Sequence, residues 1–484
     1  MEGRADVLAD AIVAFNLAIL GYLIAKELFV LGMGVLSWWE LRDDEFQRSA
    51  AAMRALAGSD TTPPISVVMP AYNEEAGIAE AVRSMTMLDY PRFEVIVVND
   101  GSTDGTVARM VEQFDMVPID APYRRAIDTQ TVRSIYRSRR PLPVVLLDKE
   151  NGGKADAVNA GVNVARYPYV LVTDGDTVVE KDALLRLSRY VVRDRSRVVA
   201  VGGNVRPVNG CRLRAGEVIQ VGLPKGFVER VQVVEYLRSF LGSRPGFSRI
   251  NGLLIVSGAF GLFRRQAVVE VGGFRRDHLG EDMEIVVRMH RHFRRMREGY
   301  RIAFAADAVA WTEVPQAAKD LRRQRIRWHR GLLQTLWQYR GMVANPRYGV
   351  VGMVSWPAFF AFEVLAPVVE VLGWIAVPLA VSYGFLALDV ALVLAGIAIV
   401  VGVGNSLLGL YLDDRMGYYG SAAAAARLLG VAWLENFGFR QRTVWWRVRA
   451  MFWNPREHRW GHLPRRGVAN LAGDPAPVGD RARG

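Results

Sequence analysis

Apolar residues are concentrated in long runs near both ends of the chain, whereas its middle shows short apolar runs separated by polar segments. The first long run extends from about Val7 to Leu36. A second block, from Val350 to Leu412, is long enough for two spans, which we place at about 364–385 and 387–412. Since about 20 apolar residues cross a bilayer as a helix, the pattern predicts one membrane span before the middle region and two after it.

Two further segments near the second apolar block combine apolar and charged residues. The stretch Tyr418–Phe439 contains Arg427 and Glu435, so we expect an interfacial helix there rather than a third carboxy-terminal span. The stretch Ala317–Arg340 is basic and helical in pattern, which is typical of a helix in the membrane interface. Arginine-rich flanks favour the cytoplasmic side, so two carboxy-terminal spans place the middle region and the tail in the cytoplasm.

Short β-rich runs alternate with helical stretches between Ile65 and about Trp311. The runs are 65–69, 93–98, 144–147, 169–173 and 198–202. This alternation predicts an α/β domain with a mostly parallel sheet and helices on both faces. Ligands of such sheets bind at the carboxyl ends of the strands. The stretch Asp115–Arg140 interrupts the alternation, and we interpret it as a surface insertion of unassigned role.

These patterns divide the chain into successive regions. The first apolar run follows acidic rather than basic residues, so we expect a retained anchor and not a cleaved signal peptide. The predicted regions are an anchor (1–40), a linker (41–64), a cytosolic α/β domain (65–312), interfacial helices (313–349), transmembrane and interfacial helices (350–439) and a basic cytosolic tail (440–484).

Composition narrows the class of protein. The chain has 484 residues, is 51% hydrophobic and carries a formal net charge of +12. Much of the basic charge lies beside apolar, Trp-rich stretches, and no nucleic-acid-binding motif is present. We therefore expect membrane lipid and a phosphate-bearing substrate as partners, and no nucleic acid. The single cysteine, Cys211, excludes an intrachain disulfide and a cysteine-based metal site.

Polar signatures follow the first two predicted strands. The first is Pro70-Ala71-Tyr72-Asn73-Glu74-Glu75, where Asn73 alone would also suit an ordinary helix cap. The second contains Asp100, and an acid at a strand end can accept hydrogen bonds from a uracil ring or a ribose. A glycine-containing turn before a helix is the alternative interpretation of this second signature.

Acidic and basic residues surround the fourth predicted strand. It ends in Asp174-Gly175-Asp176, and two such carboxylates can hold Mg²⁺ or Mn²⁺ against a diphosphate. The alternative is a tight turn with solvated acids. Upstream, Gly152 and Gly153 precede Lys154, which can reach a phosphate although the spacing is not that of a P-loop. A helix cap with a surface lysine explains these three residues equally well.

Two signatures lie on predicted helices. Glu281 and Asp282 begin an amphipathic helix, where a carboxylate can act as the general base that a hydroxyl acceptor needs. Helix capping is the alternative. Gln324, Arg327 and Trp328 share one helix face, where the arginine can neutralise a leaving diphosphate and the indole can stack on a sugar. A basic interfacial helix without a catalytic role also fits this pattern.

In this order, the signatures resemble those of processive glycosyltransferases of family 2, which include cellulose, chitin, hyaluronan and poly-N-acetylglucosamine synthases. The resemblance covers about Ile65 to Tyr339. It is carried by Asp100, Asp174-Gly175-Asp176, Glu281-Asp282 and Gln324-Arg325-Ile326-Arg327-Trp328. It implies a nucleotide-sugar-binding domain of the glycosyltransferase A type, flanked by transmembrane and interfacial helices.

The resemblance also implies a UDP-sugar donor, a growing polysaccharide acceptor and roles for the matched positions. Asp282 would be the catalytic base, with Glu281 beside it, and Asp176 would be the main metal ligand together with Asp174. The donor would be bound by Ala71, Tyr72, Glu74, Asp100, Lys154, Asp174, Gln324 and Arg327. The acceptor would be bound by Trp328, Ser257 and Gly258. The donor sugar, N-acetylglucosamine or glucose, stays open, as do export or regulatory subunits.

The sequence leaves two alternative functions open and offers one further pair of candidate residues. A non-processive enzyme would add one sugar to a membrane lipid, although the Gln-x-x-Arg-Trp pattern favours a polymer. A non-catalytic scaffold would tolerate a broken acidic set, whereas Asp174, Asp176 and Asp282 are all present. Glu363 and Glu370 lie within the second apolar block, where acids are costly, so they are candidates for lining a polymer path or for snorkelling to water.

Overall fold

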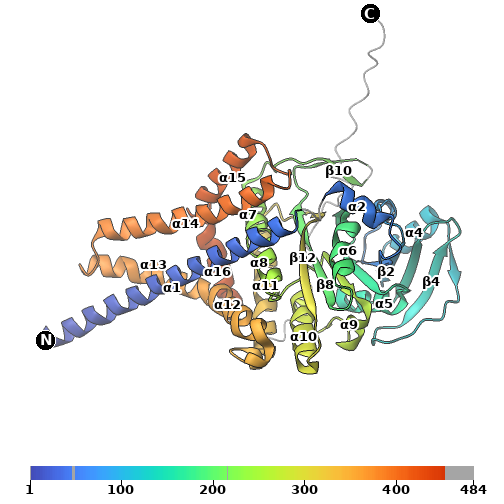
Figure 1. The fold of residues 1–484 in the computed structure, drawn as a ribbon. Helices are drawn as coiled ribbons and strands as arrows, with labels where there is room; N and C mark the ends of the chain where they lie inside the picture. Colours follow the sequence, from blue (N-terminus) through green and yellow to red (C-terminus); the bar gives the residue numbers. More distant parts are fainter. Residues whose placement is uncertain (1, 46–48, 215, 453–484) are drawn as a thin grey trace, which may run out of the picture.

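A ten-stranded mixed sheet forms the centre of the protein (Figure 1). The structure is a computed structural model that describes residues 2–45, 49–214 and 216–452. The strand order is β3-β4-β5-β2-β1-β6-β11-β8-β12-β7. The strands are β1 (Ile65–Ala71), β2 (Phe93–Asp100), β3 (Met116–Ile119), β4 (Val132–Ser138), β5 (Val144–Lys149), β6 (Tyr169–Thr173), β7 (Val178–Val179), β8 (Val198–Pro207), β11 (Phe260–Arg264) and β12 (Arg301–Thr312). A separate two-stranded sheet contains β9 (Arg212–Arg214) and β10 (Glu217–Gln220).

The core of the large sheet is parallel, as the sequence predicts. Strands β5, β2, β1 and β6 pair in parallel, and so do β8 and β12. Antiparallel β11 lies between β6 and β8, so the sheet is mixed with a mostly parallel core, which agrees with the predicted mostly parallel sheet. All five predicted runs are strands, and they are buried because helices cover the sheet.

Helices pack on this sheet and connect its strands. Helix α5 packs on β1 and β2, while α6 and α7 pack on β8. The helices of this domain are α3 (Ile78–Thr86), α4 (Thr106–Phe114), α5 (Lys154–Val164), α6 (Ala183–Arg193), α7 (Phe227–Phe240), α8 (Arg244–Arg249), α9 (Arg265–Glu270), α10 (Glu281–Met296) and α11 (Ala318–Gln338). The short helix α2 (Ala50–Ala57) lies in the predicted linker.

The predicted insertion Asp115–Arg140 extends the sheet. It contains β3 and β4, which pair with each other, and β4 pairs antiparallel with β5. Side chains of β4 are only intermittently buried, because its outer positions face solvent. The insertion therefore forms one edge of the fold.

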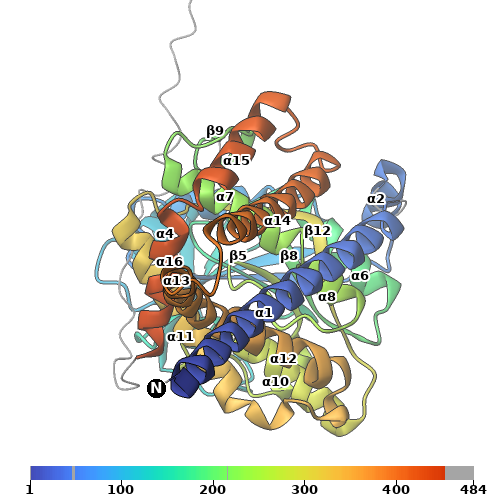
Figure 2. The same cartoon turned by 90° about the vertical axis from the view of Figure 1, so that its left-hand side faces the viewer.

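Within the part of the chain that the structure describes, three helices are long and apolar enough to cross a membrane, and they project together from one side of the α/β domain (Figures 1 and 2). They are Ala11–Asp43 within α1 (Glu2–Asp43), Val351–Ser382, and Leu388–Asp414, which is α14. The second span passes through two π-helical segments, Val351–Ser355 and Phe360–Leu365, before it continues as α13 (Ala366–Ser382). One helix thus precedes the domain and two follow it, which is the predicted arrangement.

The segment after these spans contains two shorter helices. Helix α15 (Ala422–Leu434) has 13 residues, too few to cross a bilayer. Helix α16 (Phe439–Met451) packs against both α11 and α13. The predicted basic tail continues beyond it, but its residues from 453 onwards lie outside the described part of the chain.

Ion pairs connect the spans to the rest of the protein. Arg206 at the end of β8 and Asp413 at the end of α14 are 2.5 Å apart, and both side chains are almost completely buried. Glu370 of α13 accepts a hydrogen bond of 2.8 Å from Arg440 of α16, and Glu363 lies 2.9 Å from Arg447. Glu363 and Glu370 therefore have basic partners, and their role in a polymer path stays a prediction.

Candidate active site

Four segments of the chain meet around the side chain of Lys154, at the carboxyl ends of the parallel strands. Its ammonium group forms an ion pair with Asp174, the residue directly after β6. It also donates to the carbonyl of Gly258 at 3.2 Å and lies 3.8 Å from Glu281 Oε1. The sequence predicts a role for all four residues, and the fold places them together.

The glycine loop that presents Lys154 is held by Asp100 at the end of β2. The Asp100 carboxylate accepts hydrogen bonds from the backbone amides of Gly152 (3.0 Å) and Gly153 (2.7 Å). Gly153 has a φ of 85°, which favours glycine. Asp100 is thus engaged within the protein and fixes the start of α5; its predicted contact with a uridine stays a prediction.

A buried lysine, which sequence reasoning missed, supports this loop. Lys149 at the end of β5 is fully buried, and its ammonium group lies 2.5 Å from Asp100 and 2.7 Å from Asp156. Asp156 is buried as well and pairs with Arg276 at 2.9 Å. One sequence signal could have identified Lys149, namely a charged residue at the end of an apolar strand. Such a residue is expected to be buried, and a buried charge needs a partner of opposite charge.

The loops that follow β1 and β2 are linked to each other. The amide of Asn73 donates to Ser102 Oγ at 2.9 Å, and the amide of Thr103 donates to Asn73 Oδ1 at 2.8 Å. Asn73 has a φ of 55°, a left-handed conformation that asparagine tolerates. On this loop Ala71 is buried, Tyr72 is exposed and Glu74 is half-buried.

The acidic pair after β6 has the composition of a divalent-cation site. The side chain of Asp174 is partly exposed and already faces a cation, the Lys154 ammonium, while Asp176 is buried. Among the described residues no set of three His, Cys, Asp or Glu side chains is arranged around one metal position. Two carboxylates fit Mg²⁺ or Mn²⁺, because such ions complete their coordination with waters and substrate phosphates.

The first turn of α10 places two more carboxylates beside Lys154. Asp282 Oδ2 accepts a hydrogen bond of 3.2 Å from the amide of Gly258. Burial raises the pKa of Glu281 to about 7, even though the charge of Lys154 opposes this shift. Burial lowers the pKa of Lys154, but the carboxylates of Asp174 and Glu281 outweigh it and hold this pKa above its ordinary value. Lys154 therefore stays positively charged within an acidic cluster.

Helix α11 carries the Gln-x-x-Arg-Trp residues next to this cluster. Gln324 is buried, and the positive charge of Arg327 acts on Glu281, where it partly opposes the rise in pKa that burial causes. Trp328 is 42% exposed, and the guanidinium carbon of Arg325 lies 4.6 Å from its ring centroid. A partly exposed indole on the helix that also carries Arg327 is available to stack on a sugar ring.

Arg244, at the start of α8, is a second residue that sequence reasoning missed. It lies in a buried environment, and this burial lowers the pKa of Arg244 to about 10, although the Asp282 carboxylate acts in the opposite direction. Its Nη1 atom is buried without a hydrogen-bond partner among the described residues. A cation in this position is electrostatically coupled to Asp282. No local sequence pattern distinguishes Arg244 from the many surface arginines.

Comparison with known proteins adds an independent line of evidence. Residues 63–331 match the family model described as glycosyltransferase-like family 2. The chain is 28% identical over 274 residues to a poly-β-1,6-N-acetyl-D-glucosamine synthase of Staphylococcus aureus, covering 56% of this chain and 55% of that protein. It is 26% identical over 314 residues to the Staphylococcus epidermidis protein of the same name, covering 63% of each chain. The chain thus spans about half to two thirds of the length of these relatives.

A solved structure has the same fold. The mannosyltransferase PcManGT from Pyrobaculum calidifontis, in complex with GDP-Man and Mn²⁺, superposes with a TM-score of 0.52 at 20% sequence identity. The match covers 90% of this chain and 98% of that chain, so it includes the sheet and the flanking helices. The family model covers more than half of the chain and contains every strand-end signature described above. The chain therefore belongs to glycosyltransferase-like family 2 and is a glycosyltransferase.

Proposed function

We propose that the protein is a membrane-embedded, inverting transferase that moves sugar from a UDP-sugar to the end of a growing β-linked polysaccharide. The observation that carries this proposal is the convergence of Lys154, Asp174, Glu281 and Asp282 at the carboxyl ends of the strands. The relatives named poly-β-1,6-N-acetyl-D-glucosamine synthase support a polymer product and favour UDP-N-acetylglucosamine over UDP-glucose.

The donor lies, in this proposal, across the ends of β1, β2 and β6. Its uridine is near Asp100 and the loop that contains Ala71, Tyr72 and Glu74. Its diphosphate faces the cations Lys154 and Arg327, with Gln324 beside them on α11. Lys154 suits this role because its charge is retained in a buried, acidic setting. A diphosphate carries the negative charge that both cations balance as UDP departs.

The metal and the acceptor complete the site. Asp174 and Asp176 would hold Mg²⁺ or Mn²⁺, which when bound neutralises charge on the diphosphate. The sugar end of the polysaccharide stacks on Trp328 and lies along the loop of Ser257 and Gly258. Gly258 suits this contact because its amide already binds Asp282, which brings the acceptor loop and the base together.

The chemical step follows from this arrangement. An acceptor hydroxyl loses its proton to the Asp282 carboxylate as its oxygen bonds to the anomeric carbon of the donor sugar. The bond between that carbon and the UDP oxygen breaks, and UDP leaves with both bonding electrons. Attack from the face opposite UDP inverts the configuration, so an α-linked donor gives a β-linkage. General base catalysis of this kind contributes roughly 10²–10⁴-fold in rate.

The membrane arrangement supports export of the product, again as a proposal. Three apolar helices would cross the bilayer, with the α/β domain and the basic α16 on the cytoplasmic side. A polymer that is extended beside α11 would then leave along the adjoining spans. Export or regulatory subunits that join this assembly are partners of the same proposal.

The test is UDP release and product size, measured on the purified protein in lipid with Mn²⁺ or Mg²⁺ and a panel of UDP-sugars. We expect a long polymer from UDP-N-acetylglucosamine, and Asp282→Asn to lose turnover by roughly 10²–10⁴-fold while it still binds UDP. Asp277→Asn, the same change at a nearby exposed acid, is the matched control and keeps its activity. If the product is a single sugar on a lipid, the proposed polymer product is wrong. If none of the UDP-sugars is turned over, the proposed catalytic activity is wrong.

A further inference from the structure

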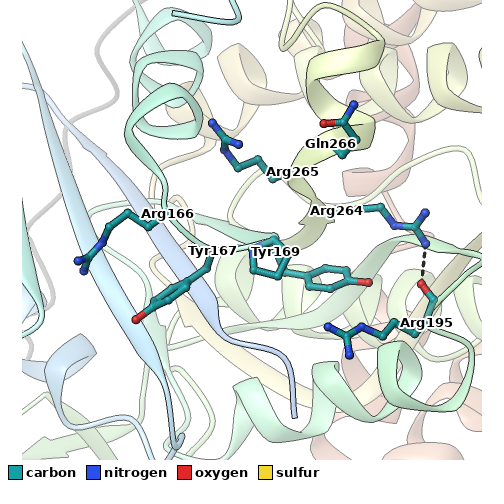
Figure 3. A pocket seen from close by; sticks show the side chains of 8 residues that line it. Arg166, Tyr167, Tyr169, Arg195, Arg264, Arg265 and Gln266 are labelled. Atoms are coloured by element: carbon teal, nitrogen blue, oxygen red, sulfur yellow. Dashed lines mark hydrogen bonds between the residues drawn. The ribbon is translucent and has the colours of Figure 1, made fainter. Parts of the chain in front are cut away.

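A basic pocket lies at the opposite end of β6 from the candidate active site. Figure 3 shows the side chains around this open hollow of about 490 Å³. They come from the segment before β6, the loop between α6 and β8, and the junction of β11 and α9. Four are arginines and two are tyrosines: Arg166, Arg195, Arg264, Arg265, Tyr167 and Tyr169. We call this site the arginine pocket; none of its described lining residues is acidic.

Two of the arginines are fixed by backbone carbonyls, which leave their charge uncancelled. Arg264 Nη2 donates to the carbonyls of Arg195 (2.9 Å), Ser196 (2.9 Å) and Val198 (2.7 Å). Arg265 Nε donates to the carbonyl of Val162 at 2.8 Å. A guanidinium that is held in place by neutral groups is ordered before a ligand arrives, which reduces the entropy cost of binding.

The remaining two arginines leave the pocket positively charged. Arg166 pairs with Glu94 at 2.8 Å, which offsets one charge. The guanidinium of Arg195 is exposed and has no hydrogen bond or ion pair with a described residue. Burial and the nearby charge of Arg124 together lower the pKa of Arg265, as expected where positive charges are incompletely balanced.

We propose that the arginine pocket binds a small phosphate-bearing anion, such as a pyrophosphate or a nucleotide. Guanidinium groups present paired donors that match phosphate oxygens, and the tyrosines offer rings and hydroxyls beside them. The binding claim does not depend on the proposed function. A soluble anion is the ligand that fits, because α9 lies on the domain away from the apolar spans in Figure 1.

The arginine pocket is separate from the donor site but connected to it. Tyr169 begins β6 and Asp174 follows its end, so the strand separates the two sites by roughly 17 Å. Strand β11 runs from the segment after Gly258 to Arg264, and α5 runs from Lys154 to the segment that Arg265 contacts. Strands β6 and β11 and helix α5 thus each have one end in the arginine pocket and the other in the donor site. An anion that orders the pocket therefore acts on the donor site through these elements. This coupling rests on the proposed function.

The binding test is hydrogen–deuterium exchange of the full chain in neutral-lipid nanodiscs, without metal, with and without pyrophosphate. We expect slower exchange in peptides covering 164–169 and 193–198. Arg195→Glu abolishes this protection and raises the Kd for pyrophosphate at least about ten-fold, because it reverses a charge that faces the ligand. Arg193→Glu, the same change at an exposed arginine outside the pocket, retains the protection.

Other outcomes overturn the proposal. Protection confined to peptides at the carboxyl ends of the strands, or protection that is equal in the two variants, refutes an anion site in the arginine pocket. Protection by phosphatidylglycerol nanodiscs without pyrophosphate would assign the arginine pocket to lipid headgroups instead.

The coupling between the two sites is tested separately. Inorganic phosphate should change the rate of UDP release more in the Arg193→Glu variant than in the Arg195→Glu variant. An identical response refutes coupling, while UDP release itself reports on the proposed function independently.

Discussion

Gly331 of α11 lies directly against Gly280, the residue that precedes the two carboxylates of α10. A Cβ atom at position 331 would stand 2.9 Å from the backbone nitrogen of Gly280, closer than real Cβ contacts allow. Gln334 reinforces the contact, since its side chain accepts from the amide of Leu279 at 3.1 Å. The Gly280–Gly331 contact therefore sets the position of the Gln-x-x-Arg-Trp helix relative to Glu281 and Asp282.

Gly331→Ala tests this contact. The added methyl group meets backbone, which cannot rotate away, so α11 shifts relative to α10. A displacement near 1 Å in a catalytic site can cost roughly 100-fold in rate, so we expect kcat/KM to fall at least about ten-fold. Gly341→Ala is the control, because a Cβ there meets nothing within 4 Å. Wild-type kcat/KM in a folded Gly331→Ala variant would show that the contact does not position the site.

Arg244→Met tests the buried cation near Asp282. The loss of its charge disfavours the ionised form of the Asp282 carboxylate, which accepts the proton in the proposed mechanism, so we expect kcat to fall about ten-fold or more. The acid limb of the pH–rate profile should move to higher pH, an effect that a packing defect does not produce. The thermal midpoint should stay the same or rise, since the substitution removes a buried charge whose Nη1 has no hydrogen bond to a residue that the structure describes.

Arg249→Met provides the comparison on the same helix. Arg249 contacts Glu40 and Asp43 at the end of α1 and lies outside the acidic cluster. We expect it to change stability slightly and the pH–rate profile not at all. An unshifted profile in Arg244→Met would reduce Arg244 to a packing role.

The strand ends could be predicted from sequence because their signals are local. The run Tyr169–Thr173 is apolar, and Asp174 and Asp176 follow at once, so strand and site are specified within a few residues. Arg244 and the Gly280–Gly331 contact could not be predicted, since each depends on neighbours distant in sequence. Strand β11 was missed because a short run such as Phe260–Phe263 directly before a helix indicates neither a strand nor its direction.

Arg206→Met tests the connection between the α/β domain and span α14. This substitution leaves Asp413 buried and unpaired, which typically costs 3–5 kcal/mol, so we expect a clear fall in the thermal midpoint in detergent. The double variant Arg206→Met/Asp413→Leu removes both charges and should recover much of that loss. A double variant whose loss equals the sum of the single losses would show that the pair is not coupled.

Three buried histidines make the folded protein sensitive to acid. Burial lowers the pKa of His278 and of His290 to about 4 each, and burial with the charge of Arg447 lowers the pKa of His329 to about 3. In the unfolded chain these side chains take up protons near pH 6.5. Their contribution to stability is therefore fully present above pH 6.5 and is lost as the pH falls toward 4 or below.

His329→Leu isolates one of these groups. The Nε2 atom of His329 is buried and accepts or donates no hydrogen bond among the described residues, so leucine removes the titrating group at little structural cost. Between pH 6.5 and 4 each such histidine costs about 1.4 kcal/mol per pH unit, so the thermal midpoint of the wild type should fall steeply on acidification. The variant should fall less steeply and match or exceed the wild type at pH 5. His292→Gln, a half-buried histidine on α10, should keep the wild-type slope, and parallel slopes for all three proteins would contradict a buried neutral His329.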